Sequence, residues 1–241
     1  MLQGFYSAVV GAQQQMLRMD VQANNISNVN TNGFKAQVPA FQALMYGMLD
    51  GIEGEQLPRG TGARMSGTAT NPDTGSIRET GRNLDYAIIG DGYFALYDPR
   101  TGETTYTRDG AFTMAAFPIQ GGGAESVFYL SDGEGRQVLN ANRQAIPVTD
   151  PNEELPIGVF NIQYEDGLLR TDSSRFQATA KNGAIAAVDA RVEQGLLEES
   201  NVDLATELTQ VIEAQRSYSY VLKMVQTADE VETTVIGLTN G

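Results

Sequence analysis

The sequence predicts an α+β protein in which N- and C-terminal helices pair as a coiled coil and a central segment forms an antiparallel β-rich domain. Apolar residues recur at alternating steps of three and four near both ends, which predicts the helices. Most of the 26 glycines lie in the middle, many in Asp-Gly turns, which predicts the sheet. The expected divisions are an N-terminal helix with an Asn-rich turn (1–35), an extended linker arm (36–83), the β-rich domain (84–192) and the C-terminal helix (193–241).

The N-terminal helix is predicted by a heptad spacing that runs without a break through residues 2–26. Such spacing keeps one narrow apolar stripe facing a partner helix. The stripe consists of Leu2, Phe5, Val9, Ala12, Met16, Met19, Ala23 and Ile26. Met16 and Met19 also fit ordinary core positions within one monomer. The helix should end in residues 24–33, because Asn and Gly tolerate left-handed backbone and form local turns.

The C-terminal helix is predicted by a second stripe with the same spacing. Its members are Leu204, Leu208, Val211, Gln215, Tyr218, Leu222 and Val225. Between Asn201 and Ile236 there is no Pro or Gly to break the helix. Asn201 or Asp203 is the expected N-cap, and acidic residues cluster near the start, where the helix dipole favours them.

The middle of the chain alternates short apolar runs with turn signals. Asp-Gly pairs or an Asp-Pro turn separate runs such as 84–90, 93–97 and 104–107, which predicts an antiparallel domain. One further hairpin is expected from 157–164 to 168–171 across Asp166-Gly167. Residues 51–83 hold seven glycines, two prolines and few apolar side chains, and we interpret them as extended or irregular.

Composition excludes several classes of function. The chain has no His and no Cys, which removes the common nucleophilic triads and the usual ligands of zinc, copper and haem, so we expect no cofactor and no small-molecule substrate. A net charge of −14 argues against nucleic acid and anionic membranes as partners. Residues 1–17 carry no charge and no unbroken apolar core, so we expect neither a cleaved signal peptide nor a membrane-inserted helix.

The remaining chemical motifs are weak. The Gly-rich stretches at 90–92 and 121–123 lack the residues of a dinucleotide fingerprint or a phosphate loop, and 132–135 lacks the spacing of a calcium loop. A pair of carboxylates could hydrolyse glycosidic bonds. The candidates are Asp91, Glu103, Asp109 and Asp166. Each lies in or near an expected turn, and nothing in the sequence brings two of them together.

Ordered motifs along nearly the whole chain resemble the rod, hook and hook-junction proteins of the bacterial flagellum. The N-terminal signature is ANNISNVNTNGFK at 23–35, followed by FQALMY at 41–46. LDYAIIGDGYF at 84–94 and YTRDGAF at 106–112 resemble the family's β-domain, as do IGVF at 157–160 and FQAT at 176–179. GLLEESNVDL at 195–204, AQRSY at 214–218 and QTADE at 226–230 resemble its C-terminal helix. Ser27 and residues 220–222 depart from the common pattern.

The resemblance implies a structural subunit of the flagellar rod that polymerises helically through its terminal helices into a hollow drive shaft. The implied partners are copies of the chain, other axial proteins of rod and hook, and the type III export apparatus. The implied location is the basal body, across the periplasm or cell wall. The short length favours the rod proteins over the longer hook protein. The 41–46 motif and Gly60–Arg64 favour the distal rod type over the proximal type.

The resemblance also implies which residues pack against other subunits. These comprise both stripes, Arg216 and the Asn-rich turn with Asn24, Asn25, Asn28, Asn30, Thr31, Gly33 and Phe34. Residues 1–50 carry no net charge, whereas 193–241 carry −7, so assembly should depend on salt. Two alternatives stay open at this point, namely another self-assembling or adhesive surface protein and a carboxylate-based cell-wall glycan hydrolase.

Overall fold

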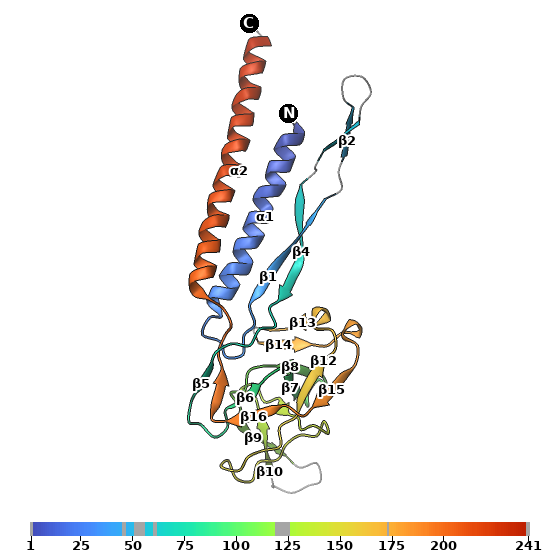
Figure 1. Cartoon of the computed structure of the whole chain (residues 1–241), viewed down its shortest axis with the longest axis vertical. Helices are drawn as coiled ribbons and strands as arrows, with labels where there is room; N and C mark the ends of the chain where they lie inside the picture. Colours follow the sequence, from blue (N-terminus) through green and yellow to red (C-terminus); the bar gives the residue numbers. More distant parts are fainter. Residues whose placement is uncertain are drawn as a thin grey trace. The chain divides into compact units, whose positions relative to one another are not determined.

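Two long helices occupy the two ends of the chain in the computed structural model. The structure describes residues 2–44, 47–50, 56–59, 62–118, 126–172 and 174–239. Helix α1 is Leu2–Ser27 and helix α2 is Leu204–Thr239, so both predicted helices are confirmed (Figure 1). Asp203 caps α2, since its Oδ1 accepts from the Ala205 amide at 3.1 Å. Residues 193–198, expected in the C-terminal helical region, form strands instead.

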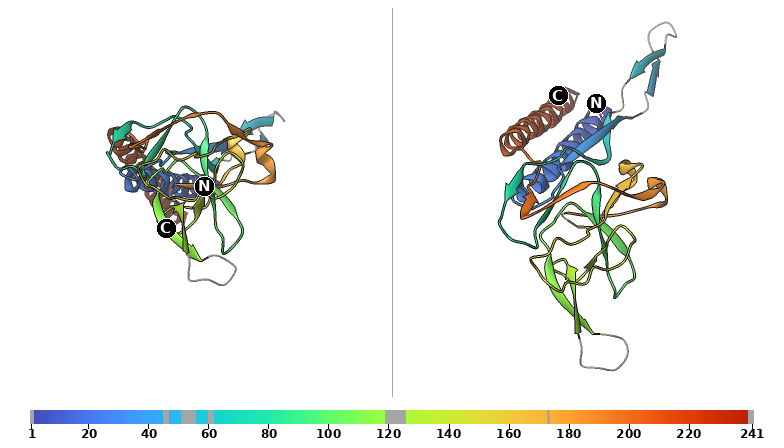
Figure 2. Two further views of the ribbon diagram at one scale, coloured as in Figure 1. Left: turned by 90° about the horizontal axis from the view of Figure 1, so that it is seen from below. Right: turned by 60° about the horizontal axis from the view of Figure 1, so that its bottom comes forward.

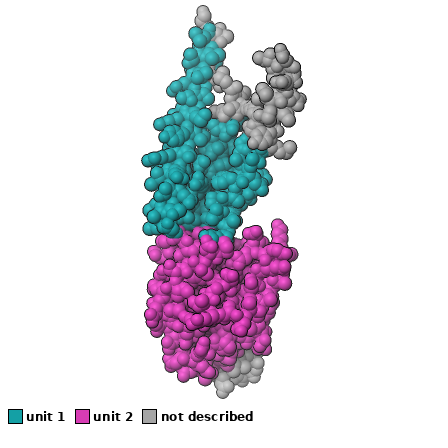
Figure 3. Space-filling view, in the orientation of Figure 1, with its two compact units in different colours: residues 1–27, 37–71, 203–241 teal, residues 28–36, 72–202 magenta. Residues whose placement is uncertain are grey.

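The chain divides into two compact units, coloured separately in Figure 3. Unit 1 comprises Met1–Ser27, Gln37–Asn71 and Asp203–Gly241. Unit 2 comprises Asn28–Ala36 and Pro72–Val202. Each unit is therefore built from segments that are far apart in the sequence.

Unit 1 combines the two helices with a ribbon of strands. The helices lie side by side and run antiparallel, as Figure 1 and Figure 2 show. Strand β1 (Gln37–Ala43) pairs antiparallel with β4 (Ala63–Thr70), with a bulge at Ala40/Phe41. Strands β2 (Gly47–Asp50) and β3 (Gln56–Arg59) pair beyond them. The segment expected as an extended arm is thus largely a hydrogen-bonded ribbon, which satisfies the backbone of a sequence with few apolar side chains.

Unit 2 contains the antiparallel sheet that the turn signals predict. Its strand order is β13-β14-β8-β7-β11-β10-β9, and β12 pairs with both β7 and β15. The strands are β7 (Tyr93–Tyr97), β8 (Thr104–Thr107), β9 (Thr113–Pro118), β10 (Ser126–Ser131), β11 (Gln137–Val138), β12 (Val159–Ile162), β13 (Leu169–Arg170), β14 (Arg175–Gln177) and β15 (Ile185–Val188). Two smaller pairs complete the unit, β6 (Tyr86–Ile89) with β16 (Arg191–Gln194) and β5 (Ile77–Glu79) with β17 (Leu196–Glu198).

Only some predicted turns close hairpins. Strands β7 and β8 pair across 98–102 as expected. The hairpin expected across Asp166-Gly167 is wrong, because β12 pairs with β7 and β15 while β13 pairs with β14. Here the chain forms a short 3-10 helix (Glu165–Gly167), and the Tyr164 amide donates to Asn182 O at 3.1 Å. Long-range pairing therefore overrides the local turn signal.

Two large clusters of buried apolar side chains form most of the core of unit 2, and a smaller cluster surrounds Phe34. One cluster contains Phe94, Leu96, Phe112 and Leu130, and the rings of Phe94 and Phe112 meet edge to face at 5.2 Å. The other contains Tyr93, Phe160 and Phe176 among others. Full burial of each such side chain contributes roughly 2 kcal/mol, so these clusters give unit 2 a hydrophobic core of its own.

Candidate subunit-packing surface

Side chains of the predicted α1 stripe differ in burial. Ala12 is buried, and Val9, Met19 and Ile26 are half-buried. Met16 (49% exposed) and Ala23 face solvent. The side chains of Leu2 and Phe5 lie outside the described residues. The buried positions of α1 also include Val21, Gln22 and Asn25, which the heptad pattern did not single out, apart from Asn25 in the turn motif.

On α2 the predicted stripe is mostly exposed. Leu204, Leu208 and Leu222 are 43%, 47% and 39% exposed, and Gln215 and Arg216 are also exposed. Val211, Tyr218 and Val225 are half-buried. Among the described side chains of α2, the fully buried one is that of Ala214, one residue away from the predicted stripe. A small side chain there allows close approach of another segment.

Polar contacts fix the register between the helices. Gln22 Nε2 donates to Gln210 Oε1 at 3.2 Å, and Asn25 Nδ2 donates to Glu207 Oε1 at 3.0 Å. Arg18 and Glu213 approach to 3.8 Å. From one contact to the next, the α1 residue number falls by three or four while the α2 residue number rises by three. This is the pattern that an antiparallel pair of helices requires. Buried polar pairs of this kind specify register, because a shift would leave them without partners.

Apolar side chains beyond the helix contact are left exposed. On α1 they are Tyr6, Met16 and Leu17. On α2 they are Leu204, Leu208, Ile212, Tyr220, Leu222, Met224, Val231, Val235, Ile236 and Leu238. An exposed apolar surface of this extent is unusual on a monomer and typical of a site for protein contacts.

Residues of the Asn-rich turn make contacts within the chain. Asn25 Oδ1 accepts from the Gln37 amide at 2.9 Å, and its Nδ2 also donates to Gln37 O. The Thr31 amide and hydroxyl donate to Asn28, the ordinary pattern of a turn. Asn24 and Asn30 are exposed. Their role in packing against other subunits stays a prediction.

Gly33 and Phe34 end this turn inside unit 2. Gly33 has φ +63°, and a Cβ there would lie 2.4 Å from the backbone of Arg108. Phe34 is fully buried with Ala36 and Val202. Both residues, predicted to pack against other subunits, are therefore occupied by contacts within their own unit.

Sequence reasoning missed a buried ionic group beside this turn. Glu198 accepts from Lys35 Nζ at 2.7 Å and from Arg108 Nη1 at 3.2 Å, and all three side chains are at most 3% exposed. Burial lowers the pKa of Lys35, and Glu198 opposes that effect. Lys35 lies in the N-terminal motif and Glu198 in the C-terminal motif, so both residues were visible in the sequence. No local sequence pattern indicates that they contact each other.

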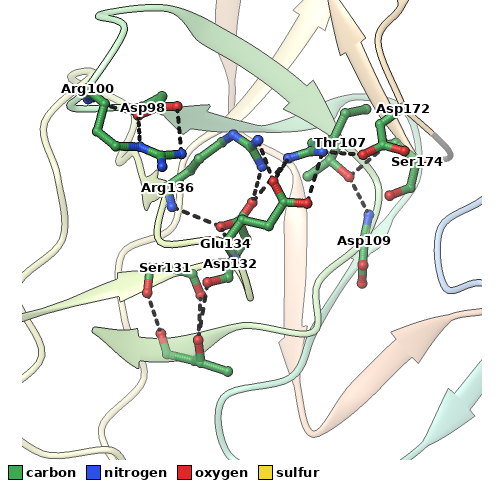
Figure 4. A network of polar contacts seen from close by, with 12 residues as sticks. Asp98, Arg100, Thr107, Asp109, Ser131, Asp132, Glu134, Arg136, Asp172 and Ser174 are labelled. Carbon is green, nitrogen blue, oxygen red and sulfur yellow. Dashed lines mark hydrogen bonds and ion pairs between the residues drawn. The ribbon is translucent and has the colours of Figure 1, made fainter. Parts of the chain in front are cut away.

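Glycan hydrolysis requires two carboxylates that face a common substrate site. Asp109 lines a cavity of about 310 Å³ together with Asp132, Glu134 and Asp172. Arg175 and Arg136 form ion pairs with these last three carboxylates. Figure 4 shows Arg136 beside Asp132 and Glu134 in this network. Asp91, Glu103 and Asp166 are exposed and do not line this cavity. The cluster is thus an ion-pair network that joins loops, not two free carboxylates facing a substrate.

In the described part of the chain, no group of three or more acidic side chains is arranged to hold a metal ion. No described helix combines the length and apolar content needed to cross a bilayer.

Three family profiles match successive parts of the chain. Residues 5–35 match "Flagella basal body rod protein" and residues 87–122 match "Flagellar hook protein FlgE/F/G D1 domain". Residues 193–238 match "Flagellar basal body rod FlgEFG protein C-terminal". The first and last profiles cover the two helices, and the middle one begins in β6 and extends past β9.

Full-length relatives carry the same description. The "Flagellar basal-body rod protein FlgG" of Caulobacter vibrioides is 31% identical over 261 residues, which cover 95% of this chain and 97% of the relative. The chain belongs to the flagellar basal-body rod protein family. The FlgG of Bacillus subtilis is 28% identical over 99% of both chains, and the FlgF of C. vibrioides is 31% identical over 94% of this chain and 95% of the relative. The chain is thus similar to rod proteins of both names.

Proposed function

We propose that this chain is a structural subunit of the flagellar rod, and that it polymerises helically with copies of itself and with other axial proteins into a hollow shaft that transmits motor torque to the hook. Membership of the rod family and the family names of its relatives support this function. The observation that carries it is the row of exposed apolar side chains on α2. Such a row acquires its buried environment only from other chains.

The lengths of the helices support contacts with neighbouring subunits. At 1.5 Å per residue, α2 with 36 residues is longer than α1 with 26 by about 15 Å. The register places the last residues of α2 beyond Leu2, the first described residue of α1, so Ile236 and Leu238 have no described α1 residue opposite them. A head-to-tail contact that covers this end propagates along an axis and does not close. In the assembly the α1–α2 pair acts as a coiled coil that lines the shaft.

We infer that the terminal helices are disordered in the free subunit and fold when they join neighbours. Two helices that pair partly through polar contacts, with apolar rows left in water, bury too little surface to be stable alone. A chain with disordered ends suits passage through the type III export apparatus without a cleaved signal. Amide exchange on dilute monomer tests this inference, because protection throughout 6–26 in a monomer would contradict it.

We propose the distal part of the rod as the position of the subunit. The motif at 41–46 and Gly60–Arg64 support the distal type, although residues 45–46 and 60–61 lie outside the described residues. The FlgF relative supports the proximal type as the alternative. Electron microscopy of basal bodies from a strain that lacks the chain separates the two. The distal proposal requires that the rod segment beside the hook is missing while the segment beside the inner membrane is present.

A thiol-labelling experiment tests the packing of α2 directly. The natural chain has no cysteine, so Leu208→Cys introduces the only thiol. We expect a maleimide reagent to label it readily in secreted, unassembled chain and at least tenfold more slowly in isolated basal bodies. Glu153→Cys, in an exposed loop of unit 2, controls for labelling of the free chain. Equal labelling of Leu208→Cys in both states would contradict burial of this face in the rod.

A further inference from the structure

The side chain of Glu198 is the centre of a buried ionic group in unit 2. Its Oε1 accepts from Lys35 Nζ at 2.7 Å and from the Gly75 amide at 2.9 Å. Its Oε2 accepts from Arg108 Nη1 at 3.2 Å. One carboxylate therefore binds three segments that are far apart in the sequence.

The cations around Glu198 are themselves held by unit 2. Lys35 Nζ donates a second bond to Asp73 O at 2.7 Å, and Arg108 Nη2 donates to Gly90 O at 2.8 Å. The guanidinium of Arg108 also stacks over the ring of Tyr93 at 5.5 Å. Two buried cations share one carboxylate, so loss of the Glu198 charge would leave both cations out of water without the carboxylate that they contact.

Backbone contacts join the same two parts of the chain. The Gly33 amide donates to Glu198 O at 2.8 Å, and the Asn201 amide donates to Phe34 O at 3.3 Å. The Ala36 amide donates to Asn201 Oδ1 at 2.7 Å. Residues 33–36 and 198–202 are thereby fastened side by side, over the buried side chains of Phe34, Ala36 and Val202.

These two segments are the ones that connect unit 2 to the helices. Helix α1 ends at Ser27, six residues before Gly33, and α2 begins at Leu204, six residues after Glu198. All the contacts described lie within unit 2, so they need neither helix to be folded. Because both connecting segments are short and start from the same fixed point in unit 2, the end of α1 and the start of α2 are held close together. This raises the effective concentration of each helix end near the other.

We propose that Glu198 fastens the segment leaving α1 to the segment leading into α2, and that this fastening is complete in the free subunit before the helices pair. The helices then pair first at their joined ends, where Asn25 contacts Glu207, and the pairing extends toward their free ends. The fastening is a property of the monomer, and only its later use in the rod rests on the proposed function.

Hydrogen–deuterium exchange on full-length, dilute monomer tests the proposal. The reporters are the amides of Gly33, Ala36, Gly75 and Asn201, and the reference amides are those of β7 and β8 in the sheet. We expect the reporters in the natural chain to be protected as strongly as the reference amides, whatever the state of the helices. We expect Glu198→Gln to speed exchange of the reporters at least tenfold. Glu199→Gln, at a half-exposed neighbour that pairs with Arg78, is the matched control and should leave the reporters unchanged.

Unprotected reporter amides in the natural monomer would overturn the proposal. It would also be overturned if Glu198→Gln speeds exchange of the reporters no more than Glu199→Gln does. If Glu198→Gln also exposes the reference amides, Lys35→Met decides the matter. That variant leaves Glu198 paired with Arg108. The proposal requires it to speed exchange of the reporter amides while the reference amides stay protected. The absence of this local effect would refute the proposal. The exchange experiment does not measure rod assembly. A failure of the proposed function would instead be seen as equal labelling of Leu208→Cys in free chain and basal bodies, and it would leave the exchange of the reporter amides unaffected.

Discussion

Asn25 of α1 and Glu207 of α2 are joined by a hydrogen bond of 3.0 Å from Nδ2 to Oε1. The same Asn25 side chain binds both the amide and the carbonyl of Gln37 at the start of β1. Burial raises the pKa of Glu207, and the bond from Asn25 offsets part of that shift. One amide thus joins the three parts of unit 1 where its two helices begin to pair.

Asn25→Ala should weaken the incorporation of the chain into rods. The substitution removes three hydrogen bonds and leaves the Gln37 amide and Glu207 without this partner, which costs roughly 1–3 kcal/mol. We expect about tenfold less chain in purified basal bodies, measured by quantitative immunoblotting against secreted chain. Gln13→Ala, at an exposed position of the same helix, should incorporate normally. Equal incorporation of both variants would show that the Asn25 contacts are dispensable.

Leu208→Asp should prevent assembly without unfolding unit 2. Leu208 is 47% exposed in the chain, so an aspartate is solvated in the monomer but buried against a neighbour in the rod. We expect loss of motility in soft agar and an unchanged thermal transition of the sheet. Thr209→Asp places the same charge at the next exposed position and serves as the control. Motile cells carrying Leu208→Asp would rule out this face as a packing surface.

Gly33→Ala should destabilise unit 2 much more than Gly81→Ala. Both glycines have positive φ (+63° and +67°), so the backbone strain of alanine, about 1–2 kcal/mol, is common to both. Only at Gly33 would the new Cβ meet backbone, at 2.4 Å from Arg108 C and Asp109 N, whereas Gly81 faces open space. Chemical denaturation should show an extra loss of roughly 2 kcal/mol or more for Gly33→Ala. Equal losses would mean that the segment relaxes freely.

Asp109→Asn should remove a pH dependence of stability. Burial raises the pKa of Asp109, and the nearby Asp132 and Asp85 raise it further. The folded chain therefore binds this proton more tightly than the unfolded chain, so the free energy of unfolding decreases as pH rises from about 4 through the raised pKa. Asparagine keeps the Oδ1 acceptor for the Ala111 amide at 3.0 Å. Denaturation at pH 4.5, 6 and 7.5 should show a smaller slope for the variant and greater stability at pH 7.5.

Asp91→Asn makes the same substitution at an exposed residue of unit 2 and is the control. The difference between the two variants at each pH isolates the contribution of Asp109. An unchanged slope in Asp109→Asn would assign the pH dependence of unit 2 to other carboxylates.

Local patterns in the sequence were sufficient to predict the helices and strands, but not which strands pair with one another. The uninterrupted stretch from Asn201 to Ile236 and the Asp203 cap predicted α2, because helix formation depends on neighbours within one turn. Turn signals predicted the strands of unit 2 but not that β12 pairs with β7 and β15. Strand pairing is decided by contacts between distant segments, which no local window contains.

The sequence alone determined that this chain has helical ends, a turn-rich antiparallel centre and no His or Cys for common catalysis. The tertiary structure decided which face of each helix is used. The heptad pattern pointed to Leu208, yet the helix turns Ala214 inward, because a small residue and matched polar pairs allow closer approach than a row of leucines. It also decided that Glu198 meets Lys35, 163 residues away, since only folding brings a buried carboxylate to its counter-charge.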